Sequence, residues 1–192
     1  GGESLVEQYQ RNSLMKGLKN CNDNDLIILS DVDEIPDLNK LNIFGKKNKY
    51  AVFSQRMFNY KINLLNETEN NWHGSKICLK KNLKSPQWLR NLKFKKYPFW
   101  RIDKPKNLQI IENGGWHFAY LKSPADISKK IKSSAHGEFN KADFVDQENI
   151  EKKINMRKDI FDREILYKKI EIDSSFPKYI IKNKEKFKDW II

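Results

Sequence analysis

The sequence predicts a single α/β domain, and three observations lead to that prediction. Short runs of apolar, β-branched and aromatic residues alternate with stretches that repeat apolar residues at helical spacing. No internal repeat and no Gly/Ser-rich linker divides the 192 residues. Hydrophobic residues make up 39% of the chain and aromatic residues 12%, which supports a packed core at this length. We expect one domain over residues 1–192 with a helical C-terminal third.

The first half of the chain predicts a helix and three strands. Apolar side chains recur at close to every fourth position over residues 3–20, so an amphipathic helix is expected to pack one face against the domain. The apolar run at 26–29 is bounded by turn formers and is typical of a strand buried on both faces of a parallel sheet. Residues 50–60 and 75–79 are the next strand candidates.

The second half predicts two more strands and then helices. Residues 108–111 and 116–121 are strand candidates on either side of a pair of glycines. Ser123 and Asp146 each precede a helical pattern as capping residues, and a lysine-rich helix is expected after Pro177.

The positive charge lies in the middle of the chain. The net charge is +12, yet residues 1–40 carry four basic and eight acidic side chains, whereas residues 41–110 carry sixteen basic and three acidic ones. One interpretation is a solvated lysine surface, and the other is a surface that attracts anions. The candidate anions are a diphosphate donor, an anionic glycan acceptor and an anionic membrane surface.

Only negative features constrain the cellular location. The longest apolar stretch is far shorter than the roughly 20 residues that cross a bilayer, and the first residues show no leader pattern. Two cysteines provide neither a disulfide framework nor a CxxC metal clip. We expect a cytoplasmic protein or one associated peripherally with a membrane. Asn66-Glu67-Thr68 matches the N-glycosylation pattern, which carries little weight in such a chain.

Three carboxylates follow the strand predicted at 26–29. Asp31, Asp33 and Glu34 lie at the carboxyl end of that strand, where open α/β sheets bind ligands. Carboxylates so close repel one another unless a cation is bound. A hard divalent ion such as Mn²⁺ or Mg²⁺, shared with a diphosphate, is the simplest explanation. The alternative is an acidic turn whose side chains cap the next segment.

Two enzyme classes place an Asp-x-Asp motif at such a strand end. Phosphatases of the haloacid dehalogenase type use an aspartate as nucleophile, and nucleotide-sugar glycosyltransferases hold a metal ion against the donor diphosphate. The phosphatase also needs its strand at the start of the domain and a later acidic pair, and this sequence meets neither condition clearly.

A third alternative is a basic polyanion-binding module. In it, lysines between residues 80 and 104 would follow a nucleic acid while the aromatic residues between them stack on bases. That alternative leaves Asp31 and Asp33 unexplained, because acids repel phosphates unless a metal ion intervenes. We therefore expect no nucleic-acid partner.

Short motifs along nearly the whole chain carry a family resemblance. In order, they are EQYQRN from residue 7, SDVDEIP from 30, QRMFNY from 55, WHGSK from 72, GGWHF from 114 and HGEF from 136. This order is similar to that of glycosyltransferase family 17, which contains the β-1,4-mannosyl-glycoprotein 4-β-N-acetylglucosaminyltransferases. The resemblance implies a GT-A fold with a mostly parallel, Rossmann-related sheet. It also implies that family members have a further N-terminal part that this chain lacks.

The same resemblance implies an activity. It is the inverting, metal-dependent transfer of a sugar, N-acetylglucosamine in the named relatives, from a UDP-sugar donor to a glycan acceptor. Asp31 and Asp33 would hold the metal ion, Mn²⁺ or Mg²⁺. His117 resembles the late metal-ligating histidine of several GT-A enzymes and would complete the set, and its alternative is a histidine satisfied in the core.

Donor contacts are expected from residues within these motifs. They are Arg11, Asn12, Asp31, Trp72, Lys76, Gly114, Gly115 and Trp116. Charged groups would offset the diphosphate, glycines would allow close backbone approach, and tryptophans would stack on a sugar or base. The alternatives are a solvated surface for the charged groups, a tight turn for the glycines and core packing for the tryptophans.

The catalytic base is expected among the remaining carboxylates. Inversion needs a carboxylate that accepts the proton of the acceptor hydroxyl as the new bond forms. Glu112 lies nearest the glycine pair, and Glu138 follows in the HGEF motif. Either is a candidate, and the alternative for each is a surface or capping acid.

Overall fold

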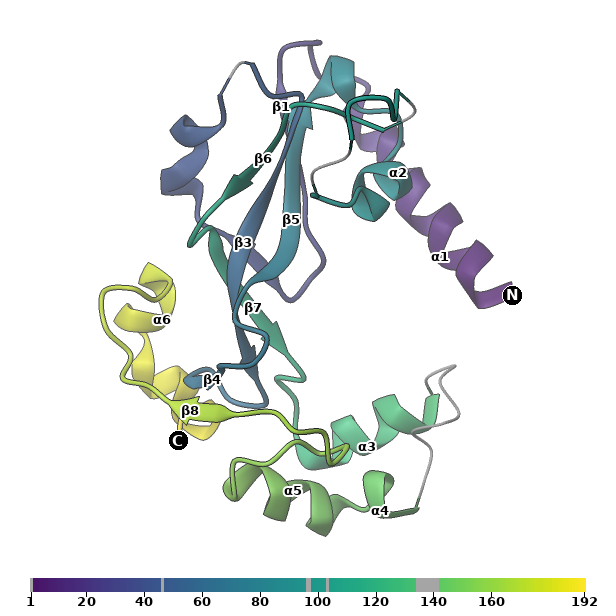
Figure 1. Ribbon diagram of the computed structural model, residues 1–192. Helices are drawn as coiled ribbons and strands as arrows, with labels where there is room; N and C mark the ends of the chain where they lie inside the picture. The colour runs from purple at the N-terminus through teal and green to yellow at the C-terminus, as the bar shows by residue number, and fades with distance from the viewer. Residues whose placement is uncertain (1, 46, 96–97, 103, 134–141) are drawn as a thin grey trace. The chain divides into compact units, whose positions relative to one another are not determined.

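The computed structural model describes residues 2–45, 47–95, 98–102, 104–133 and 142–192 (Figure 1). The chain divides into two compact units. Unit 1 comprises residues 1–55 and 73–115, and unit 2 comprises residues 56–72 and 116–192. The strand at 50–59 therefore contributes its first half to unit 1 and its second half to unit 2.

The sheet of unit 1 combines antiparallel and parallel pairs (Figure 1). β1 (Leu26–Leu29) runs antiparallel to β5 (Trp72–Leu79), which lies next to β3 (Tyr50–Asn59). The first half of β3 runs parallel to β6 (Leu108–Ile111). The short strand β2 (Glu34–Pro36) follows the acidic loop after β1.

Both faces of this sheet are covered. Successive strand residues point to opposite sides, so each strand contributes side chains to two separate clusters. On one face Phe53 and Ile77 pack with η2, a 3₁₀ helix at Leu38–Ile43. On the other, Cys78 packs against α2 (Pro86–Asn91), which follows the short 3₁₀ helix η3 (Lys80–Asn82).

The N-terminal helix contacts α2 through polar side chains. α1 (Gly2–Ser13) continues as the 3₁₀ helix η1 (Leu14–Leu18). Arg11 Nη1 donates to Gln87 Oε1 at 2.5 Å, and Gln87 N donates to Asn12 Oδ1 at 3.1 Å. Apolar side chains of α1 remain exposed, as in Tyr9 at 72%. The helix was predicted correctly, but the apolar contact expected for it was wrong.

The sheet of unit 2 begins at the second half of β3. This half runs parallel to β7 (Gly115–Ala119) and antiparallel to β4 (Leu64–Asn66), and β4 runs antiparallel to β8 (Tyr167–Lys169). A cluster around Phe58 and Phe118 packs against the C-terminal helices, α6 (Lys178–Lys182) and the 3₁₀ helix η5 (Lys184–Trp190).

A second apolar cluster of unit 2, around Tyr60 and Leu64, packs against three helices. They are α3 (Pro124–Ser133), α4 (Ala142–Val145) and α5 (Gln147–Asn155). The predicted starts are confirmed, because Ser123 Oγ accepts from Asp126 N at 3.2 Å and Asp146 Oδ2 accepts from Asn149 N at 2.8 Å. Each cap satisfies a backbone donor that the first helical turn leaves open.

Three expectations about the fold need correction. The sheet is mixed rather than mostly parallel, since β1–β5, β3–β4 and β4–β8 are antiparallel. β1 is an edge strand and Leu26 is 44% exposed, so this strand is not buried on both faces. The C-terminal third is not helical throughout, because residues 156–177 contain β8 and no helix. A short apolar run does not by itself distinguish an edge strand from a central one.

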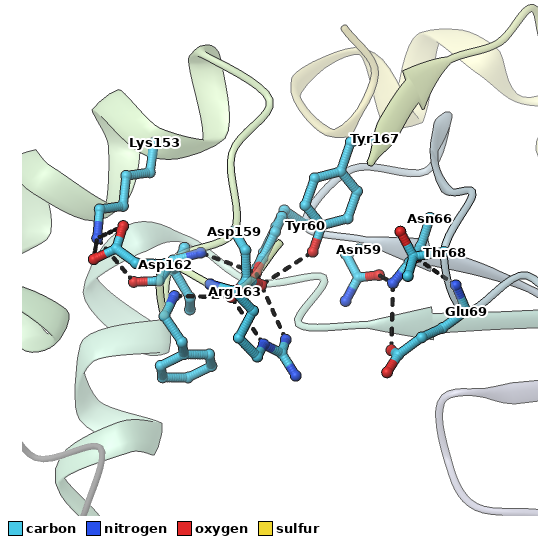
Figure 2. Close-up of polar contacts among 12 residues, drawn as sticks. Asn59, Tyr60, Asn66, Thr68, Glu69, Lys153, Asp159, Asp162, Arg163 and Tyr167 are labelled. Carbon is cyan, nitrogen blue, oxygen red and sulfur yellow. Dashed lines mark hydrogen bonds and ion pairs between the residues drawn. The ribbon is translucent and has the colours of Figure 1, made fainter. Parts of the chain in front are cut away.

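A buried carboxylate, Asp159, joins Tyr60, the residue after β3, to β8 and to the segment after α5 (Figure 2). Tyr60 and Tyr167 donate their hydroxyls to Asp159 Oδ1 at 2.9 and 3.1 Å. Arg163 donates Nε to Oδ2 and Nη2 to Oδ1, both at 2.9 Å. Burial raises the pKa of Asp159, but the hydrogen bonds from Arg163 and Tyr60 outweigh it, so the pKa lies below its usual range.

The N-glycosylation pattern is closed off in the fold. The Asn66 side chain is buried, and Nδ2 donates to Asn59 Oδ1 at 3.2 Å (Figure 2). Thr68 Oγ1 accepts from Leu166 N at 2.9 Å. The Asn66 side chain is therefore part of the packing of β4, and Thr68 holds the backbone at Leu166.

At Gly115 the backbone leaves no room for a side chain. Its φ is +137°, and a Cβ added there would lie 2.1 Å from Ile35 O of β2. Gly115→Ala should lower the free energy of unfolding by about 1–3 kcal/mol or more, measured by urea denaturation. Gly17→Ala is the control, because nothing lies within 4 Å of its Cβ, and its stability should be unchanged or slightly higher. Equal urea midpoints for Gly115→Ala and Gly17→Ala would contradict the steric conflict expected at Gly115.

Candidate functional site

The acidic loop after β1 is closed by its own hydrogen bonds. Ser30 Oγ donates to Ser75 Oγ of β5 at 2.7 Å, which anchors the start of the loop. Asp31 N donates to Glu34 Oε2 at 3.1 Å, and Glu34 N donates to Asp31 O at 3.0 Å. Glu34 is buried, and it shapes the loop that presents the partly exposed Asp31 and Asp33.

Arg90 of α2 is the closest charged partner of Asp31. Its Nε and Nη2 donate to Asp31 Oδ2 at 2.9 and 2.7 Å. Arg11 Nη2 lies 4.0 Å from Asp31 Oδ1. Burial lowers the pKa of Arg90, but the hydrogen bonds and charge of Asp31 raise it above its usual value. The guanidinium is therefore fixed as a cation beside the acidic loop.

Lys76 lies behind this pair on β5. Its side chain is buried, and Nζ donates to the backbone oxygen of Arg90. Burial, followed by the charge of Arg90, lowers the pKa of Lys76 to about 8, although Glu34 and Asp31 act in the opposite direction. Near neutral pH a second cation thus lies behind the acidic loop.

These cations line a cavity of about 420 Å³ in unit 1. Its charged and polar lining consists of His73, Lys76, Arg90, Asn91, Lys93 and Lys95. No acidic side chain belongs to the lining among the described residues. The cavity therefore has the electrostatic character of an anion site, and Arg90 connects it to Asp31.

The aromatic candidates lie in unit 2 and contact their own chain. The ring of His117 on β7 is buried and stacks on Trp72 with centroids 4.8 Å apart and planes 12° apart. Trp116 Nε1 donates to Ser175 O at 3.0 Å. His117 thus belongs to unit 2, whereas Asp31 and Asp33 belong to unit 1.

The glycine pair and the acidic candidates follow β6. Gly114 N donates to Ser54 O at 2.6 Å, and Asp37 N donates to Gly114 O at 2.8 Å, so the turn after β6 lies on the backbone of unit 1. Glu112 is exposed in this turn. Glu138 lies outside the described residues.

A divalent ion would find oxygen ligands at the acidic loop. Among the described residues, no group of three His, Cys, Asp or Glu side chains gathers as a metal site. Mg²⁺ and similar ions commonly use one or two carboxylates, retained waters and the phosphates of the substrate. Asp31 and Asp33 fit that donor set, whereas a closed site made by the protein alone is not formed in the described part.

The comparison with protein families decides the assignment. The model of glycosyltransferase family 17 matches residues 3–191, nearly the whole chain. The chain belongs to glycosyltransferase family 17. Neither the comparison with curated proteins nor that with solved structures found a match.

Membership in glycosyltransferase family 17 makes the chain a glycosyltransferase, with a nucleotide-sugar donor and a glycan acceptor in general. The resemblance of the short motifs to this family is thereby confirmed. Sequence reasoning missed Arg90, which lies in no motif. Its one available signal was chemical: an arginine stands out in a basic segment made almost wholly of lysines. In the described part of this glycosyltransferase, every helix is too short or too polar to span a bilayer.

Lys76 makes a pH-dependence prediction. Its folded pKa is about 8, whereas an unfolded lysine has about 10.4. Between these values the unfolded chain binds more protons, so this side chain makes the protein more stable as the pH rises from about 8 to about 10. Lys76→Met should remove that contribution in urea denaturation across this range. Lys93→Met is the control, because Lys93 is an exposed lysine of the same cavity. If the free energy of unfolding of the parent and of Lys76→Met changed equally between about pH 8 and about pH 10, the lowered pKa of Lys76 would be contradicted.

Proposed function

We propose that this family 17 chain transfers N-acetylglucosamine from its UDP-sugar to a glycan acceptor, with inversion and with a divalent ion, Mn²⁺ or Mg²⁺. One observation carries the proposal: within unit 1, an acidic loop and a cationic cavity are joined by the ion pair in which Arg90 donates twice to Asp31 Oδ2. The acidic loop would bind the divalent ion, and the cationic cavity would bind the diphosphate that the ion accompanies.

The leaving diphosphate would be held from two sides. Asp31 and Asp33 would hold the divalent ion, which supplies Lewis-acid neutralisation of the diphosphate when bound. Arg90 offers guanidinium donors whose direction is set by Asp31, and Lys76 adds charge from behind. Such fixed cations stabilise the charge that develops on the leaving group as the bond to the sugar breaks.

The remaining sequence candidates have supporting roles in this proposal. Arg11 lies near Asp31, and Asn12 is held against α2 through Gln87. Gly114 and Gly115 would shape the turn that carries Glu112. Within unit 2, Trp72, Trp116 and His117 would offer aromatic rings to a sugar.

The catalytic base is proposed to be Glu112 or Glu138. Replacement of the base should reduce kcat with a small change in donor KM, because the base acts on the acceptor proton in the transition state. Glu112→Gln and Glu138→Gln should therefore differ, with one lowering kcat by about 10²-fold or more. Unchanged kcat in both variants would exclude both residues.

A donor screen tests the proposed function. The protein is incubated with a set of UDP-sugars, with Mn²⁺, Mg²⁺ or a chelator, and UDP release is measured with and without glycan acceptors. The proposal expects UDP release from UDP-N-acetylglucosamine that a chelator abolishes. Release from another UDP-sugar alone would overturn the donor assignment, and release that persists with the chelator would overturn the metal dependence.

A further inference from the structure

A loop of unit 1 between α2 and β6 exposes large apolar side chains. Phe99 is 80% exposed, Trp100 66% and Ile102 90%. Monomeric proteins seldom expose such groups together, and where they do the patch usually marks a contact surface. All three lie within residues 99–102, which we call the apolar tip.

Backbone hydrogen bonds hold this tip in shape. Arg101 N donates to Pro98 O at 3.1 Å, and Ile102 N donates to Trp100 O at 2.9 Å, which makes two overlapping turns. Lys106 Nζ donates to Phe99 O at 2.9 Å. The rings of Phe99 and Trp100 pack edge to face, with centroids 5.1 Å apart. The apolar side chains are thus presented rather than collapsed onto the core.

A cationic cavity of about 420 Å³ adjoins the tip. Four lysines contribute to its lining, which also includes Ile102 of the tip: Lys49, Lys84, Lys104 and Lys106. Lys84 Nζ lies 4.8 Å from the centroid of the Trp88 ring, another lining residue. No acidic side chain lines this cavity in the part of the chain that the structure describes. It shares none of its lining with the cavity beside Arg90.

We propose that this surface docks on an anionic lipid bilayer. Phe99, Trp100 and Ile102 enter the interfacial region, and the lysine cavity receives lipid phosphate groups. Apolar insertion combined with basic residues is the pattern of interfacial anchors, and tryptophan prefers the bilayer interface. Each lysine near an anionic leaflet contributes about fivefold in affinity.

The side chains favour a bilayer over a nucleic acid. Single-stranded nucleic acids are bound by aromatic rings on which bases stack. Ile102 is the most exposed side chain of the tip and offers no such face, whereas it suits an acyl boundary. Docking on lipid goes beyond the proposed transfer reaction and needs neither donor nor metal ion.

Vesicle sedimentation tests the docking. Vesicles of phosphatidylcholine with phosphatidylglycerol in about equal parts should bind the protein, and vesicles of phosphatidylcholine alone should bind it far less. Replacing both rings, Phe99→Ala with Trp100→Ala, should weaken binding about tenfold or more. Lys49→Glu with Lys84→Glu, two lysines of the cavity that lie outside the loop in sequence, should weaken it by a similar factor. Salt should weaken binding of the parent.

Matched controls separate the tip from general stickiness. Leu166→Ala and Tyr179→Ala remove apolar side chains of unit 2 that are 69% and 61% exposed, and both should bind vesicles like the parent. Equal binding to neutral vesicles, or tip and cavity variants that bind like the parent, would overturn the proposal. So would single-stranded RNA that binds tightly and is lost in the same variants. A chelator should leave vesicle binding unchanged, so failure here is distinguishable from failure of glycosyl transfer.

Discussion

Asp159→Ala should destabilise the protein by about 3–5 kcal/mol. The substitution leaves three groups without their partner at once: the Tyr60 hydroxyl, the Tyr167 hydroxyl and the Arg163 guanidinium. Asp159 has no exposed side-chain surface, so water does not easily replace the lost carboxylate. Urea denaturation measures the loss directly.

A neighbouring acid provides the control for this prediction. Asp162 lies three residues away and pairs with Lys153 at 2.8 Å, but its side chain is 64% exposed. Asp162→Ala should therefore cost about 1 kcal/mol or less. Similar losses for the two variants would contradict the argument that burial of Asp159 makes its network important.

Asp33→Asn should reduce the transferase rate by about 10²–10³-fold at saturating donor. The proposed role of Asp33 is to hold the divalent ion against the leaving diphosphate, and a neutral amide is a poor substitute for a carboxylate ligand. Initial rates of UDP release over a range of Mn²⁺ concentrations measure the effect. More Mn²⁺ should recover only part of the activity.

Asp37→Asn is the matched control for Asp33. Asp37 Oδ1 accepts from Asn39 N at 3.1 Å at the start of η2, and asparagine is an equally good helix cap. The rate should therefore stay close to that of the parent. An Asp33→Asn enzyme with parental rate and parental Mn²⁺ dependence would remove Asp33 from the metal site.

Local patterns predicted the elements whose signals lie close in sequence. The caps at Ser123 and Asp146 were correct because a capping side chain and its backbone donor are three residues apart. The strand at β3 was correct because its aromatic residues and Val52 favour a strand. The ordered motifs predicted the family, which the family model confirms.

Long-range partners could not be predicted in the same way. Arg90 follows Asp31 by 59 residues, and Tyr60 precedes Asp159 by 99. Neither pair leaves a local pattern, since only the fold brings them together. The position of β1 at a sheet edge is equally non-local, because it depends on which strand pairs with β5.

Calorimetric titration of UDP into the protein tests the central claim most directly. The claim is that the loop with Asp31 and Asp33 binds a divalent ion that in turn holds a nucleotide diphosphate. UDP should bind in the presence of Mn²⁺, and binding should be lost with a chelator or in Asp33→Ala. UDP that binds equally well with a chelator, or equally well to Asp33→Ala, would contradict the claim.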